Sequence, residues 1–163
     1  MRSARAFTLV ELVIVMALLC VILAVAAPSL SRSMHGRNLK QEATRLLALT
    51  EYARDEAASQ GVPMVVWIDP NAGRFGVKIK PGFEDEGVPR DKEFTLTNGM
   101  RFDGLEVSST DGGETDAAEF EPDGTLDPSS EPSINLIDQS NASITVTQTS
   151  DACGYEIVQN QQQ

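Results

Sequence analysis

Few side chains in this sequence have the types and spacing that catalysis or metal binding requires. The chain holds one histidine, His35, and two cysteines, Cys20 and Cys153, which are far apart in the sequence. A zinc site needs several cysteine or histidine ligands at short spacing, and a catalytic centre needs a nucleophile, a base or a metal within reach. The sequence also lacks a phosphate-binding glycine loop and a nucleophile elbow. We therefore expect neither an enzyme nor a cofactor-binding protein.

The carboxylates are the remaining candidates for a metal site. They gather in two polar stretches, Glu84–Glu86 and Asp111–Glu121, and calcium is bound by several oxygen ligands. Neither stretch has the spacing of an EF-hand, and acidic loops usually serve only to solvate a surface. No metal is therefore expected, and calcium is kept as the alternative.

The charge of the chain argues against a nucleic-acid partner. Its 163 residues carry 13 basic and 24 acidic side chains, for a formal net charge of -11, and no Arg or Lys follows Asp103. An acidic surface repels phosphates, and a nucleic-acid site needs an exposed basic patch. The length fits one modest domain with an anchor.

The two cysteines are expected to be structural. Cys20 lies inside an apolar run, and Cys153 is near the C-terminus. The two should lie on opposite sides of a membrane boundary, so an intrachain disulfide is not expected. We interpret Cys20 as a small buried hydrophobe and Cys153 as a core residue of the last strand, with a free thiol as the alternative for Cys153.

One carboxylate, Glu11, lies within the longest apolar segment. Residues 7–28 are apolar apart from Thr8 and Glu11. As a helix they would extend over roughly 33 Å, which is enough to cross the hydrocarbon core of a bilayer. A carboxylate inside such a span is costly, so it usually has a partner and a purpose. The basic leader 1–6 is expected to stay in the cytoplasm, with the rest of the chain outside.

Three kinds of N-terminal segment fit this pattern. An ordinary signal peptide would be cut after Ala26, since Ala24–Ala26 resembles a small-residue cleavage site. A plain signal anchor would not be cut. A segment of the third kind is cut on the cytoplasmic side, before the apolar run. Glu11 favours the third kind, because a signal peptide has no need for a carboxylate there; the simplest alternative is that it only reaches the membrane interface.

The residues around Glu11 carry a family resemblance. Residues 6–12, AFTLVEL, closely resemble the processing and methylation motif of type IV pilins and type II secretion pseudopilins. The resemblance implies cleavage between Ala6 and Phe7 by a prepilin peptidase, and N-methylation of Phe7. It makes Glu11 the fifth mature residue, where the family carries a glutamate, and Pro28 the twenty-second, where it often carries a proline. The family usually has glycine at the position of Ala6, so slower processing is expected.

The motif has a physical basis. Cleavage would leave an ammonium group on Phe7, which can pair with Glu11 of a neighbouring subunit. Each charge alone is costly in an apolar environment, whereas a pair at a fixed stagger sets the register of packed helices. Pro28 removes a helical hydrogen bond and can kink the helix where subunits leave a bilayer; the alternative is that it ends the membrane helix.

The whole pattern predicts an α+β fold, with a long N-terminal helix packed on an antiparallel β-sheet domain. Apolar residues recur every three or four positions within 29–61, which predicts an amphipathic helix. The helix is expected to end at Gly61 and Pro63. Its buried face is expected to hold Leu39, Ala43, Leu46, Thr50, Ala53 and Ala57. Beyond it, a period of two with turn signals predicts the strands Pro63–Ile68, Arg74–Lys80, Lys92–Thr97, Arg101–Val107, Ala117–Glu121, Ile134–Ile137, Ala142–Thr147 and Gly154–Val158. The expected sheet core is Val65, Trp67, Phe75, Val77, Phe94, Leu96, Phe102, Phe120, Ile144, Val146, Tyr155 and Ile157.

Two later segments narrow the resemblance to the GspH/FimT branch of minor pseudopilins. Thr50–Val65 is similar to the end of that branch's helix, where an alanine-rich segment runs into a glycine-valine-proline step. Phe120–Thr125, with the sequence FEPDGT, resembles its phenylalanine-proline-aspartate-glycine signature. In physical terms the second segment is a strand end, a turn fixed by proline and a glycine with access to positive φ.

The resemblance implies a minor pseudopilin of the type II protein secretion system, a structural subunit of a periplasmic pseudopilus that helps to export folded proteins. Its implied partners are other major and minor pseudopilins, a prepilin peptidase and the bacterial inner membrane, which the chain would cross once. The expected parts are a leader 1–6, a filament-core helix 7–28, an amphipathic helix 29–61, a periplasmic β-rich domain 62–158 and a frayed tail 159–163.

Two other functions remain open. One is a FimT-like minor pilin of type IV pilus biogenesis. The other is a secreted or anchored binding module with an ordinary signal peptide, cut after Ala26 and independent of any filament.

Overall fold

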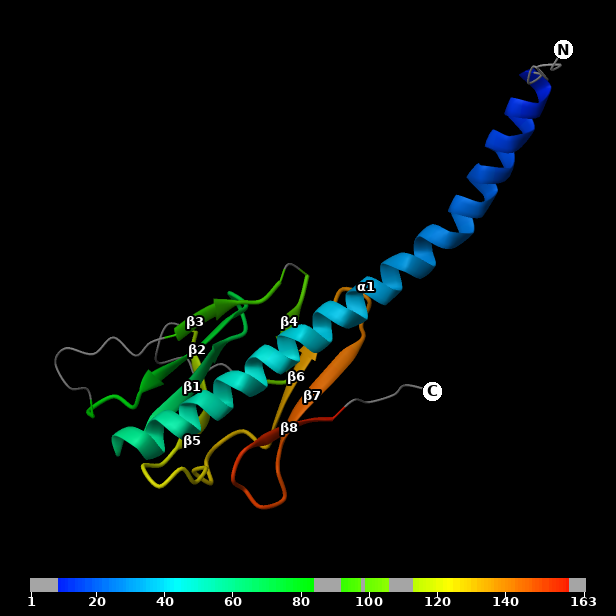
Figure 1. Cartoon of the computed structure of the whole chain (residues 1–163). Helices are drawn as coiled ribbons and strands as arrows, with labels where there is room; N and C mark the ends of the chain where they lie inside the picture. Colours follow the sequence, from blue (N-terminus) through cyan, green and yellow to red (C-terminus); the bar gives the residue numbers. More distant parts are fainter. Residues whose placement is uncertain (1–8, 84–91, 98, 106–112, 159–163) are drawn as a thin grey trace, which may run out of the picture. The chain divides into compact units, whose positions relative to one another are not determined.

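Figure 1 shows a computed structural model of the chain. The structure describes residues 9–83, 92–97, 99–105 and 113–158, and of residues 25–35 it describes the backbone alone. The chain divides into two compact units, Met1–Gly36 and Arg37–Gln163.

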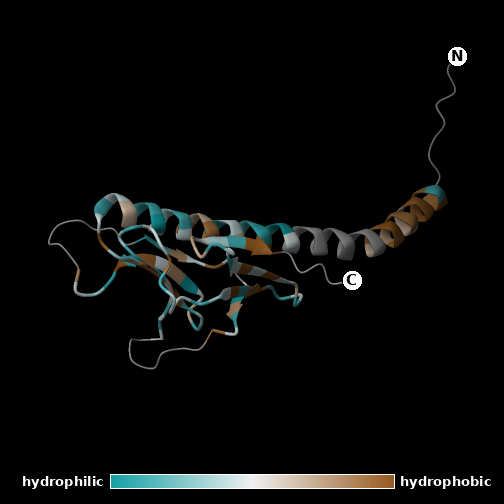
Figure 2. Ribbon diagram, turned by 90° about the horizontal axis from the view of Figure 1, so that it is seen from below, coloured by the Kyte–Doolittle hydropathy of each residue, from teal (hydrophilic) through white to brown (hydrophobic). Residues whose placement is uncertain are grey.

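Helix α1 (Leu9–Gln60) is 52 residues long and belongs to both units. Its first turns consist almost entirely of hydrophobic residues, shown in brown in Figure 2. The helix ends at Gly61, whose φ of 67° is the left-handed conformation of a C-terminal cap and whose N–H donates to the Ala57 carbonyl at 2.9 Å. Within the described part of the chain, no helix is long and apolar enough to cross a membrane.

The second unit contains two four-stranded antiparallel sheets (Figure 1). The first has the strand order β3-β2-β1-β5, and the second has the order β4-β6-β7-β8. The strands are β1 (Met64–Asp69), β2 (Arg74–Ile79), β3 (Lys92–Thr95), β4 (Arg101–Asp103), β5 (Thr115–Phe120), β6 (Ser133–Ile137), β7 (Ser143–Gln148) and β8 (Tyr155–Val158). The chain therefore leaves the first sheet for β4, returns to it for β5, and completes the second sheet with its last three strands.

All eight predicted strands are present. The largest difference in their ends is at β4, which was expected to reach Val107 and ends at Asp103, next to Gly104 with a φ of 77°. Val107 lies outside the described residues. The predicted fold class is confirmed, with the difference that the antiparallel strands form two sheets.

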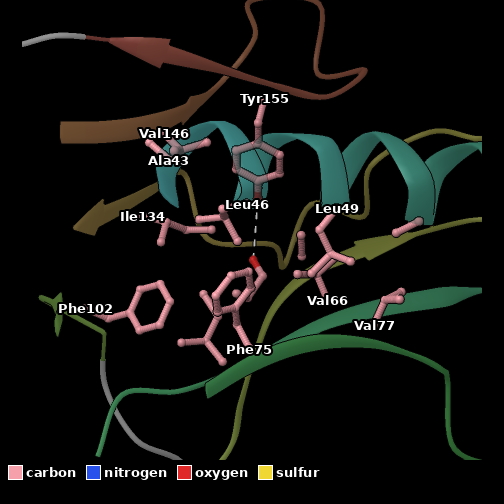
Figure 3. Packing of buried hydrophobic residues seen from close by; sticks show 14 of the residues in the cluster. Ala43, Leu46, Leu49, Val66, Phe75, Val77, Phe102, Ile134, Val146 and Tyr155 are labelled. Atoms are coloured by element: carbon pink, nitrogen blue, oxygen red, sulfur yellow. Dashed lines mark hydrogen bonds between the residues drawn. The ribbon is translucent and has the colours of Figure 1, made fainter. Parts of the chain in front are cut away.

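The core of the second unit lies between α1 and the two sheets. Figure 3 shows Leu46 and Leu49 of α1 beside Val66 of the first sheet and Ile134 of the second. The predicted face of the helix is confirmed, because all six of its residues are buried. A three-and-four spacing gathers these side chains on one stripe of a helix, and that stripe is the one that packs on the sheets.

Strand β1 contributes buried residues from both of its faces. Val65 and Trp67 are buried, as predicted, while the cluster shared with α1 and the second sheet takes Met64, Val66 and Ile68. All six residues of β1 are buried, because β1 is a central strand with both faces covered. Alternation cannot identify the core side of such a strand. Phe94 and Ile157, also predicted in the core, are partly buried at its margin.

Candidate assembly site

The first unit presents an apolar helical surface. Every large hydrophobic residue of α1 from Leu9 to Leu23 is exposed, with exposed fractions from 44 % at Val15 to 78 % at Leu9. These residues lie on all sides of the helix, unlike the single stripe of an amphipathic helix. Water does not favour so large a contiguous apolar surface, which marks a site for lipid or for a protein partner.

Glu11 is the acidic residue in the first turn of α1, and its side chain is exposed. Carboxylates are favoured in this position, since the N-terminal end of a helix carries a partial positive charge. Ala6 and Phe7, the predicted cleavage and methylation residues, lie outside the described residues. Residue 28 lies within the helical backbone of α1, and the kink expected at Pro28 stays a prediction.

A second feature is the buried carboxylate of Glu42, on the part of α1 that packs in the domain. The side chain is 3 % exposed; it accepts a hydrogen bond from the Thr97 hydroxyl at 2.6 Å and pairs with Arg45 at 3.2 Å. These contacts join α1 to the segment after β3. Sequence reasoning missed Glu42, although it lies three residues after Leu39 and four before Leu46, on the buried stripe.

The FEPDGT segment forms the predicted tight turn. Glu121 donates its N–H to the Thr125 carbonyl at 2.8 Å, and Gly124 donates to the Glu121 carbonyl at 2.8 Å. Gly124 has a φ of 79°, and a Cβ there would lie 3.6 Å from the Ala58 side chain. The turn therefore packs closely against the end of α1, and glycine provides the backbone conformation that it needs.

Tyr155 connects the two sheets. Its hydroxyl, at the start of β8, donates to the Glu131 carbonyl at 2.8 Å and lies 3.4 Å from the Ala117 carbonyl of β5. Figure 3 shows the ring reaching from the second sheet across the core. Burial raises the pKa of Tyr155 to about 12, because the ionised phenolate would lose its hydration.

Three carboxylates of the second unit lie close enough together to be considered as a metal site. One oxygen each of Glu119, Glu121 and Asp127 lies within 4.8 Å of the others. The ammonium group of Lys80 pairs with Glu119. This hydrogen bond raises the pKa of Lys80, and the charges of Glu121 and Asp127 act in the same direction. Lys80 thus already supplies a counter-charge, and the acidic residues 84–86 and 111 lie outside the described part of the chain.

One of the two cysteines lies in another environment than predicted. Cys20 is exposed on the apolar helix of the first unit, and its burial by a membrane or a filament stays a prediction. Cys153 was expected in the core of the last strand, but it lies in the turn before β8, half-buried, with its thiol 3.3 Å from the Asp151 carbonyl. It borders a cavity of about 140 Å³ between the turn and α1, whose other lining residues include Arg54 and Asp151. A lone thiol in this setting gives no indication of chemistry.

Comparison with known proteins agrees with this architecture. The family model for the prokaryotic N-terminal methylation motif matches residues 1–27, and the model for the type II transport protein GspH matches residues 42–161. A comparison with curated proteins finds no match.

Solved structures show the same fold. The minor pseudopilin EpsH from the type II secretion system of Vibrio cholerae superposes with a TM-score of 0.56 and 14% identity, covering 78% of this chain and 97% of that chain. The type IV minor pilin FimU of Pseudomonas aeruginosa superposes with a TM-score of 0.54 and 17% identity, covering 77% of this chain and 92% of that chain. At these identities the likeness concerns the fold.

Proposed function

The chain belongs to the family of the type II transport protein GspH, and we propose that this minor pseudopilin assembles into the pseudopilus of a type II secretion system through the first part of α1. The observation that carries the proposal is the exposed apolar surface from Leu9 to Leu23, in which Glu11 is the single carboxylate. This surface lies within residues 1–27, which match the model of the N-terminal methylation motif.

In the proposed mechanism of assembly, the apolar helices of neighbouring subunits pack against each other, and a charge pair fixes how far one helix is shifted along the next. Cleavage after Ala6 frees the amine of Phe7, and the N-methylated ammonium of one subunit pairs with Glu11 of the next. Burying either charge alone in an apolar bundle would cost several kcal/mol, so unpaired registers are disfavoured. The apolar residues after Glu11 then contribute non-directional packing along the filament.

The methylation motif and the family indicate a membrane-anchored periplasmic protein. We further propose that residues 7–28 cross the bacterial inner membrane once before assembly and are then extracted into the filament, in contact with other pseudopilins. The proposed cytoplasmic position of the leader 1–6 exposes the Ala6–Phe7 bond to a prepilin peptidase on that side.

The mature N-terminus tests this proposal directly. The full-length precursor is expressed with and without a prepilin peptidase, and the N-terminal peptide is identified by mass spectrometry. An N-methylated Phe7 that depends on the peptidase is the expected result. A peptidase-independent start at Ala27 would identify an ordinary signal peptide, and the filament proposal would then be abandoned.

A type IV minor pilin is the second candidate, because FimU superposes almost as well as EpsH. Deletion of the gene separates the two functions: loss of protein secretion with intact pili supports the secretion system, and loss of pili with intact secretion supports the pilus. Both phenotypes should be measured against complementation with the wild-type chain.

A further inference from the structure

The exposed side of α1 in the second unit carries a strip of positive charge. A shallow, open groove on the surface of α1 is lined by Arg37, Lys40, Gln41, Thr44, Arg45 and Ala48. It contains no carboxylate, although the chain as a whole has a net charge of -11. Among the described residues, Arg37 and Lys40 make no ion pair, while Arg45 is paired with Glu42.

The groove continues onto β3. A second hollow, of about 200 Å³, shares Arg45 and Ala48 with the first and is also lined by Tyr52, Lys92 and Phe94. The Arg45 guanidinium lies 5.6 Å from the centre of the Phe94 ring. The Lys92 ammonium lies 3.3 Å from the centre of the Tyr52 ring. We refer to Arg37, Lys40, Arg45, Tyr52, Lys92 and Phe94 as the basic strip.

The composition of the basic strip is that of a protein interface. Tyr, Phe and Arg are enriched where proteins bind each other, and the strongest contacts often come from such residues. Cation–π contacts hold the Arg45 and Lys92 side chains against rings, which reduces the conformational entropy that they lose on binding. Phosphate binding by nucleic acid is disfavoured, because the acidic remainder of the domain repels a polyanion.

The opposite edge of the same sheet has the complementary charge. The basic strip borders β3, which is one edge of the first sheet, and β5 is the other edge. Residues 104–163 contain no Arg or Lys. Their described carboxylates are Glu114, Asp116, Glu119, Glu121, Asp123, Asp127, Glu131, Asp138, Asp151 and Glu156, and the first four of these lie on β5 or next to its ends.

Several of these carboxylates remain ionised at neutral pH. Asp123, Asp127 and Asp151 each accept a hydrogen bond from a neighbouring threonine or serine hydroxyl, which lowers the pKa of each aspartate. Lys78 and Lys80 pair with carboxylates on β5 and near it, and they compensate only part of the charge. The β5 edge of the first sheet thus keeps an excess of carboxylates, whereas at the β3 edge, which also carries Glu93, the unpaired positive charge belongs to the basic strip.

We propose that the basic strip binds a carboxylate-rich edge of the adjacent pilin-like subunit. The inference rests on the proposed function, since it assumes that the chain assembles with subunits of this fold. Opposite charges on opposite edges favour a head-to-tail contact, which continues along an open filament. The apolar part of α1 would provide most of the binding, and the strip would select the rotation and neighbour of each subunit.

Photocrosslinking in cells tests the contact. The full-length chain, expressed with its secretion machinery, carries a benzophenone amino acid at Gln41 in the groove or at Met16 on the apolar helix. Products are identified by mass spectrometry of the crosslinked peptides. The expected Gln41 product is a carboxylate-bearing peptide of a pilin-like subunit, and Lys40→Glu should lower its yield by about tenfold, because charge reversal replaces attraction with repulsion.

Ser59→Glu is the matched control, since Ser59 is exposed on α1 outside the strip and should leave the yield within about twofold. Lys40→Gln should give an intermediate yield, and thermal melting of each variant checks that the domain is folded. A Gln41 product with phospholipid or with a protein of another fold overturns the inference. So does the absence of a Gln41 product while Met16 still crosslinks to pilin-like subunits. If Met16 also forms no such product, the filament proposal itself fails.

Discussion

Removing the hydroxyl of Tyr155 tests how strongly the two sheets are connected. In Tyr155→Phe the ring stays in the core, and the hydrogen bond to the Glu131 carbonyl is lost. Both nearby carbonyls keep another donor: Glu131 accepts from Gln148 at 3.3 Å, and Ala117 accepts from the Glu131 N–H at 2.9 Å. The penalty for an unsatisfied buried group is therefore small, and we expect a loss of about 1 kcal/mol in the free energy of unfolding, or about 3–5 °C in Tm.

The same variant should change the pH dependence of stability. The pKa of Tyr155 is raised to about 12 in the folded protein, against about 10 in an unfolded chain. The stabilisation by the protonated hydroxyl is complete below pH 10 and is lost as the pH rises toward 12, at about 1.4 kcal/mol per pH unit. Phenylalanine does not ionise, so the difference between the two proteins should close near pH 11.

The measurement is urea unfolding of the full chain in detergent at pH 8, 10 and 11. Trp67, which is the only tryptophan and is buried on β1, reports on the fold by its fluorescence. Tyr52→Phe is the control at pH 8, because the Tyr52 ring is half-buried and its hydroxyl bonds to none of the described residues; its effect should stay within about 0.5 kcal/mol. A Tyr155→Phe difference that is constant from pH 8 to pH 11 would refute the reasoning.

Three further predictions concern single positions. Gly76→Ala should destabilise the domain by about 2 kcal/mol or more in the same unfolding assay, because the new Cβ would lie 2.3 Å from the Lys92 carbonyl oxygen; Gly154→Ala, with no atom within 4 Å of its Cβ, is the control, and equal effects would contradict the clash. Glu11→Leu should still enter the membrane fraction but not the sheared filament fraction, and normal assembly of this variant would exclude the charge pair. Ala6→Gly should be processed at least as fast as the wild type in a pulse-chase experiment, and slower cutting would count against the proposed site.

The local elements could be predicted because they depend on near neighbours in the chain. The stripe from Leu39 to Ala57 and its stop at Gly61 follow from helical spacing and from the freedom of glycine at positive φ. The FEPDGT turn likewise needs only its own residues, closed by hydrogen bonds between Glu121, Gly124 and Thr125.

The candidate assembly site was also largely readable from the sequence. An apolar segment with one carboxylate is a property of composition and order, and the structure shows that segment as part of α1 with its large hydrophobic side chains exposed. The proposed pairing of Phe7 with Glu11 would lie between subunits, so a single chain holds no information on its geometry.

By itself, the sequence determined the helix, the eight strands, the turn at residues 121–125 and the apolar segment that we propose for assembly. Only the tertiary structure decided which strands share a sheet, that Met64 and Val66 are buried as well as the predicted Val65 and Trp67, and that Glu42 and Tyr155 are joined to distant partners. The physical reason is the range of the interactions. Local conformation depends on residues a few positions apart, whereas sheet order, burial on both faces of β1 and the partners of buried polar groups depend on contacts between segments far apart in the chain.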